Sequence, residues 1–205
     1  MPVVNQPDKN LQYALMLKLP PSTVQRVKAV QDEFAAFFPG ESFTIKYPHL
    51  TLMSCLMDPV FEDRLSLRME KLADEIPVQP VRLSGFEFLT KAFCLKVENG
   101  GALFESVFRN LPFLRKRLRM EAQVSGVEFV SHPHVTIARR LTDDQLRKAG
   151  EEWQSRRFYH EFAAAGIVLL RYPKDRGSMV VSEFAFNGKE CEARPGTPGI
   201  QTSLF

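Results

Sequence analysis

Two segments of the chain repeat one another, and this repeat limits the possible folds more than any other sequence feature. PHLTLMSCLMD spans residues 48–58, and PHVTIARRLTD spans residues 133–143. The two share Pro, His, Thr, Leu and Asp at equivalent positions, with aliphatic residues between them. Each copy has the pattern of a strand that runs into a capped helix. The two histidines lie 85 residues apart, about half of the structured chain, and this spacing favours a duplicated lobe over a tandem array.

Strand geometry gives each copy a polar face and an apolar face. Successive side chains alternate across a strand, so His49 and Thr51 share one face, and His134 and Thr136 share the equivalent face of the second copy. Approximate two-fold symmetry would bring the two polar faces together across a cleft. One imidazole could then accept a proton while the other donates one, and the threonine hydroxyls could hold a phosphate between them. This chemistry requires no metal or cofactor.

The rest of the chain predicts a bilobal α+β domain over residues 1–188, ordered from about residue 11, and a flexible Gly/Pro-rich tail over 189–205. Strands are expected near 11–19, 49–56, 78–90, 92–98, 125–130, 134–140, 158–171 and 178–187, and helices near 20–38, 59–76, 102–111, 113–120 and 142–153. Ser22 with Gln25, and Thr142 with Gln145, have the spacing of capping boxes. Strands and helices do not alternate regularly, which favours α+β over a doubly wound sheet.

Composition and charge exclude several classes of protein. No apolar run is long enough to span a membrane, and the first residues lack the features of a signal peptide, so we expect a cytoplasmic protein. We also expect a monomer. The three cysteines form no CxxC pair, which argues against a disulfide framework or a thiolate zinc site. The net charge of +3 permits an anionic ligand but does not indicate extensive wrapping by nucleic acid.

At the repeated segments the chain resembles the two-histidine (2H) phosphoesterase superfamily, whose signature is a pair of His-x-Thr/Ser-x motifs. The two motifs here are His49-Leu50-Thr51-Leu52 and His134-Val135-Thr136-Ile137. The resemblance covers roughly residues 11–188 and is strongest to the bacterial RNA ligase-like branch, often named 2′-5′ RNA ligases. It implies a bilobal fold with two antiparallel sheets around a central cleft, helices outside, and pseudo-two-fold symmetry.

The resemblance also implies roles for individual residues. His49 would donate a proton to the leaving oxygen, His134 would activate water, and Thr51 and Thr136 would bind the phosphate, although the sequence leaves open the reverse assignment of acid and base. Arg139 would be a further phosphate contact, but simple strand alternation places it on the face opposite His134. The implied reaction is hydrolysis of an RNA 2′,3′-cyclic phosphate to a 2′-phosphate, with 2′-5′ ligation as its reverse. Other members act on cyclic nucleotides or ADP-ribose cyclic phosphates.

Other histidines and aromatic residues offer alternative sites. His132 lies two residues before His134 and could join it and His49 in a metal site, although no carboxylate or thiolate cluster accompanies them. His160 is expected to be structural. Three aromatic side chains could stack on a base or pack in the core: Tyr47, Tyr172 and Phe186.

A basic segment spans residues 109–120 and carries five Lys and Arg residues without an acidic one. It could contact RNA. It could equally be a solvated helix face that covers leucines.

The C-terminus carries a second candidate motif. Gln201-Thr202-Ser203-Leu204-Phe205 resembles the pentapeptide by which many bacterial proteins bind the DNA sliding clamp, with Gln201 as anchor and Leu204 and Phe205 as pocket fillers. Thr202 departs from the usual Leu. A second hypothesis is therefore a nucleotide or RNA-end binding module, without catalysis, that this tail recruits to the clamp.

Overall fold

The computed structural model describes residues 10–41, 43, 47–98, 111–174 and 177–188. The helix expected near 102, Arg109, Cys191 and the tail with its Gln201–Phe205 motif lie outside the described residues. The strands are β1 (Leu11–Leu17), β2 (Leu50–Met57), β3 (Gln79–Leu89), β4 (Ala92–Val97), β5 (Ser125–Phe129), β6 (His134–Arg139), β7 (Tyr159–Ala164), β8 (Gly166–Tyr172) and β9 (Met179–Ala185). The helices are α1 (Pro21–Phe37), α2 (Glu62–Glu75) after the short 3-10 helix η1 (Pro59–Phe61), α4 (Leu111–Glu121) and α5 (Asp143–Trp153). No described helix is long and apolar enough to cross a membrane.

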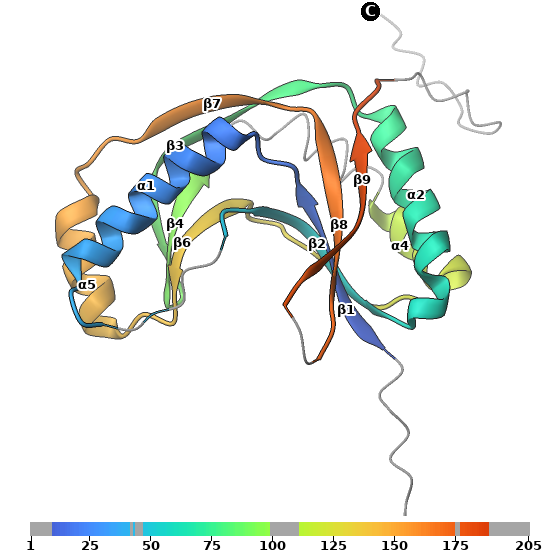
Figure 1. The fold of residues 1–205 in the computed structure, drawn as a ribbon, viewed down its shortest axis with the longest axis horizontal. Coiled ribbons are helices and arrows are strands. Elements are labelled where there is room, and N and C mark those ends of the chain that lie inside the picture. The colour runs from blue at the N-terminus through green and yellow to red at the C-terminus, as the bar shows by residue number, and fades with distance from the viewer. Residues whose placement is uncertain (1–9, 42, 44–46, 99–110, 175–176, 189–205) are drawn as a thin grey trace, which may run out of the picture.

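The strands form one curled antiparallel sheet, which confirms the predicted α+β class. In the described part of the chain the sheet has nine strands in the order β7-β3-β4-β6-β2-β1-β8-β9, and β5 pairs with β2. The two antiparallel sheets that the family resemblance implied are halves of this single sheet, joined where Leu50 of β2 pairs with Val135 of β6. Helices α1 and α5 lie against the first half, which consists of β7, β3, β4 and β6. Helices α2 and α4 lie on the side of the second half, which consists of β2, β1, β8 and β9 with β5 (Figure 1).

The capping of α1 and α5 tests two sequence predictions. The Thr142 box is confirmed: Thr142 Oγ1 accepts from Gln145 N at 3.2 Å, and Gln145 Oε1 accepts from Thr142 N at 2.9 Å. The Ser22 box is wrong. Helix α1 begins at Pro21 and its N-cap is Pro20, which places Ser22 inside the first turn. Proline's fixed φ suits the first helical position, so the helix begins two residues earlier than it would with Ser22 as its cap.

An aromatic cluster packs α1 and α5 onto the first half of the sheet. Phe34 of α1 stacks on Phe93 of β4 with ring centroids 4.9 Å apart, and it meets Trp153 of α5 at 5.3 Å. All three side chains are buried. On the second half, α2 packs against β8 and β9, and its buried side chains include Leu65 and Met69. Leu50 and Leu52 of β2 and Val135 and Ile137 of β6 belong to the same buried core, which anchors the apolar face of both motif strands.

Candidate active site

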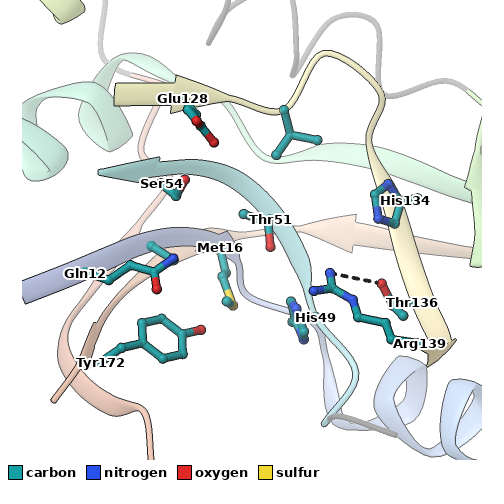
Figure 2. A pocket seen from close by; sticks show the side chains of 12 residues that line it. Gln12, Met16, His49, Thr51, Ser54, Glu128, His134, Thr136, Arg139 and Tyr172 are labelled. Atoms are coloured by element: carbon teal, nitrogen blue, oxygen red, sulfur yellow. Dashed lines mark hydrogen bonds between the residues drawn. The ribbon is translucent and has the colours of Figure 1, made fainter. Parts of the chain in front are cut away.

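The two motifs lie around one cavity of about 400 Å³ near the junction of β2 and β6 (Figure 2). Its lining residues come from five strands and from the segments beside them: Gln12, Ala14, Met16, His49, Thr51, Ser54, Glu128, Val130, His134, Thr136, Arg139 and Tyr172. The five residues that the sequence singled out as catalytic or phosphate-binding are therefore brought together.

The two histidines are held by equivalent hydrogen bonds. His49 Nδ1 lies 2.7 Å from the carbonyl oxygen of Tyr47, and His134 Nδ1 lies 2.9 Å from that of His132. A carbonyl only accepts, so Nδ1 carries the proton in both rings and Nε2 is the nitrogen presented to the cavity. In both copies the accepting carbonyl precedes the shared proline, a position confined to extended backbone. The shared geometry of the repeat thus sets the tautomer of each imidazole.

Each motif strand contains a β-bulge at its fourth motif residue. In β2 the partner changes from Met53 to Thr51 between consecutive residues of β1, so Leu52 is the extra residue. In β6 the partner changes from Ala138 to Thr136 between consecutive residues of β4, so Ile137 is the extra residue. A bulge of this kind shifts the side-chain alternation by one position.

The bulge in β6 corrects the prediction for Arg139. Regular alternation would place this residue opposite His134, but the extra Ile137 returns Arg139 to the cavity face. Its guanidinium donates to Thr136 Oγ1 at 3.4 Å (Figure 2). In the repeat Arg139 is equivalent to Ser54, which also lines the cavity after the bulge of β2. The site is therefore symmetric in its histidines and threonines and asymmetric in charge.

A buried glutamine on α1 donates hydrogen bonds to the backbone of the second motif. Gln31 of α1 is 1% exposed, and its side-chain amide lies 3.3 Å from the carbonyl oxygen of Thr136 and 3.4 Å from that of Ile137. A bulge interrupts the ladder of backbone hydrogen bonds, so these two carbonyls need donors from outside the sheet. Gln31 supplies them and ties α1 to the bulge that positions Arg139.

At the far end of the cavity sequence reasoning missed Gln12 and Glu128, whereas it named Tyr172 as a side chain that could stack on a base. Figure 2 shows Gln12, Tyr172 and Glu128 on the side away from His134 and Arg139. Gln12 pairs with Tyr172 across β1 and β8, and Ser54 pairs with Glu128 across β2 and β5. Burial raises the pKa of the Tyr172 hydroxyl, which stays a neutral donor. The one available signal was the face of β1 opposite its leucines, which carries the polar Gln12.

Other sequence candidates lie elsewhere. His132 Nε2 lies 2.7 Å from Glu87 Oε2, and among the described residues no group of three or more His, Cys, Asp or Glu side chains could hold a metal ion. Phe186 is buried and cannot stack on a ligand, and Tyr47 is 74% exposed and contributes its carbonyl to His49. His160 Nε2 lies 2.9 Å from Thr23 Oγ1, a contact between β7 and α1.

The basic segment forms most of α4 and lies outside the cavity lining. Its Leu118 is buried, whereas Arg115, Lys116 and Arg119 are exposed. The Arg115 guanidinium lies 5.4 Å from the ring centroid of Phe129. The helix thus has the solvated face over a buried leucine that is one of the two interpretations of this segment.

Comparisons with known proteins agree with this geometry. A family model for the 2′-5′ RNA ligase superfamily matches residues 19–176. Among solved structures, TT0787 of Thermus thermophilus has a TM-score of 0.61 at 21% identity, covering 87% of this chain and 100% of that one. E. coli LigT complexed with NADP+ has a TM-score of 0.62 at 18% identity, covering 87% and 99%. LigT complexed with 3′-AMP has a TM-score of 0.57 at 17% identity, covering 87% and 98%. No curated protein sequence matches the chain.

Proposed function

The chain belongs to the 2′-5′ RNA ligase superfamily, and we propose that it is a metal-independent phosphodiesterase that opens RNA 2′,3′-cyclic phosphates to 2′-phosphates. One observation carries this proposal. His49 and His134, each with Nδ1 bonded to a backbone carbonyl, present Nε2 to one cavity that also holds Thr51 and Thr136. Two imidazoles in that arrangement can serve as acid and base on either side of one phosphorus.

The proposed reaction moves two protons. His134 Nε2, unprotonated, takes a proton from water as the water oxygen attacks phosphorus. The bond between phosphorus and the 3′ oxygen breaks, and protonated His49 Nε2 donates its proton to that oxygen. The product is a 2′-phosphate with a free 3′ hydroxyl, and proton exchange with solvent resets both rings. Because the two histidines are equivalent in the fold, the assignment of acid and base follows the family resemblance.

Threonines and Arg139 stabilise the negative charge of the reacting phosphate. The hydroxyls of Thr51 and Thr136 can donate to its non-bridging oxygens, and the Arg139 guanidinium provides a fixed positive charge beside Thr136. Thr136 is buried, and Gln31 donates a hydrogen bond to its carbonyl oxygen. Both features limit the movement of Thr136, so the donors are held in place before substrate binds. Pre-organised donors of this kind act most strongly as charge develops in the transition state.

The substrate class draws support from a relative with the same fold. E. coli LigT has been solved with NADP+ and with 3′-AMP. Both ligands are nucleotides, and 3′-AMP is a nucleoside monophosphate, the class of product proposed here. A cavity of about 400 Å³ with polar groups at both ends suits one nucleotide.

Product analysis tests the proposal. The protein should be incubated with 2′,3′-cyclic phosphates of mononucleotides and of a dinucleotide, in EDTA, and the phosphomonoester identified by chromatography against 2′- and 3′-phosphate standards. We expect the 2′-phosphate and a bell-shaped dependence of kcat/KM on pH. Loss of turnover in EDTA, restored by a divalent cation, would contradict the proposal.

The sliding-clamp hypothesis is a separate proposal, because Gln201, Leu204 and Phe205 lie outside the described residues. A clamp pull-down with the full chain and with a chain ending at residue 200 tests it. Binding by the full chain alone supports recruitment through the tail. Equal capture, or none, contradicts recruitment and leaves the enzymatic proposal unaffected.

A further inference from the structure

A second cavity adjoins the catalytic one. It has a volume of about 690 Å³ and shares His134 and Arg139 with the first. Its remaining lining comes from the turn between β3 and β4 and from the segment between β6 and α5: Leu89, Thr90, Lys91, Ala92, Arg140, Leu141 and Thr142. A ligand with one phosphate at Arg139 and a second phosphate one nucleotide away could therefore occupy both cavities.

The two turns that form this cavity have unusual backbone conformations. Lys91 has a φ of 56° and Arg140 a φ of 62°, both in the left-handed region that glycine normally occupies. The Leu141 N–H donates to the Lys91 carbonyl at 3.1 Å, so the two turns are tied to each other. Non-glycine residues in this region cost free energy and concentrate at functional sites. Here the conformation brings two long cationic side chains to one cavity.

The two cavities differ in charge, and this difference would orient a bound polyanion. The second is lined by Lys91, Arg139 and Arg140, and no described carboxylate lines it. Neither Lys91 nor Arg140 forms an ion pair with another described residue. The catalytic cavity instead has the Glu128 carboxylate at its far end (Figure 2). A polyanion would be repelled by Glu128 and attracted toward Lys91 and Arg140.

We propose that Lys91 and Arg140 form a second phosphate-binding subsite, which holds the phosphodiester that precedes the terminal cyclic phosphate of an RNA. This inference rests on the proposed function and sharpens it: the preferred substrate is an oligonucleotide end rather than a free cyclic mononucleotide. The base of the terminal nucleoside points toward Gln12, Tyr172 and Glu128. The 5′ carbon of its ribose, which carries the preceding phosphodiester, faces Arg139 and the second cavity.

The test compares cytidine 2′,3′-cyclic phosphate with a cytidine dinucleotide that ends in the same cyclic phosphate. Wild type should favour the dinucleotide in kcat/KM by roughly 10- to 100-fold, the usual range for charged hydrogen bonds to a phosphate. Lys91→Gln with Arg140→Gln should remove this preference and leave the mononucleotide rate unchanged. Glutamine is shorter than lysine or arginine but stays polar and makes a similar backbone demand, so the variant loses both cationic donors without adding an apolar surface. Lys71→Gln with Arg157→Gln, both exposed cations outside the two cavities, is the charge-matched control.

Salt dependence provides an independent measurement. The slope of log kcat/KM against log salt concentration should be steeper for the dinucleotide by about 0.7 in wild type, as expected for one added phosphate contact, and equal for both substrates in the Lys91/Arg140 variant. Equal wild-type rates on the two substrates, or a variant that slows both alike, would overturn the subsite while leaving the proposed function standing. Turnover of neither substrate would overturn both.

Discussion

Leu50 of β2 pairs with Val135 of β6, and each is the second residue of a His-x-Thr-x motif. Two equivalent residues that face each other in antiparallel strands generate a local two-fold axis between them. That axis places His49 on the Thr136 side of the pair and Thr51 on the His134 side. In the proposed mechanism each half of the chain therefore supplies the acid or base on one side of the phosphate, and neither half forms the site alone.

Arg139 breaks this symmetry, and its charge can be tested against Ser54, its equivalent in the other copy. Arg139→Ser, which makes the two copies alike, should lower kcat/KM on a cyclic mononucleotide by roughly 10- to 150-fold, or about 1.5–3 kcal/mol. Ser54→Ala should have a much smaller effect because no charge is lost. Steady-state kinetics on both variants provide the measurement. Equal effects of the two substitutions would show that the guanidinium has no special role.

Gln31 should affect both stability and catalysis although it does not line the cavity. Gln31→Ala removes the side-chain amide that donates to the carbonyls of Thr136 and Ile137. Because these buried carbonyls are then left without that donor, the free energy of unfolding should fall by about 1–3 kcal/mol. Urea denaturation measures this change, and kcat should fall with it as the bulge loosens. Gln25→Ala, at an exposed position of the same helix, is the control. A Gln31 variant as stable and as active as that control would refute the supporting role.

His160 should make stability depend on pH. Burial, with a contribution from Arg26, lowers its pKa below the ordinary value of 6.5. As pH drops, His160 is therefore protonated near pH 6.5 in the unfolded chain but only at a lower pH in the folded chain. Because the unfolded chain binds more protons in this range, the free energy of unfolding falls as pH drops below 6.5. Urea denaturation at pH 7.5 and 5.5 should show a smaller loss for His160→Gln, which can still hydrogen-bond Thr23. An identical loss in both proteins would assign the pH dependence to other groups.

The sequence predicted the fold class, most of the helices and strands, and the four motif residues, because these depend on hydrophobic periodicity and on an internal repeat. The face of Arg139 could not be predicted. The bulge at Ile137 adds one residue without a glycine or proline to mark it, and a single extra residue inverts the alternation that follows. The same bulge in β2 brings Ser54 into the cavity.

The far end of the cavity and the second cavity also depend on tertiary structure. Gln12, Glu128 and Tyr172 meet only because β1, β5 and β8 become neighbours of β2 or of each other in the curled sheet. The left-handed backbone of Lys91 and Arg140 carries no local signal, since neither residue type favours it. Non-local pairing and local strain of this kind follow from the assembled sheet and not from a motif.

The most direct test of the account is the ring-opening rate of cytidine 2′,3′-cyclic phosphate at saturating substrate, in EDTA, for wild type, His49→Gln, His134→Gln and the double variant. Glutamine can hydrogen-bond but cannot transfer a proton, so each single variant should lose about 10²- to 10⁴-fold in kcat. The double variant should lose little more than the worse single one, because the two groups act as a unit. His160→Gln should retain the wild-type rate. A His49 or His134 variant that turned over as fast as wild type would contradict two-histidine catalysis.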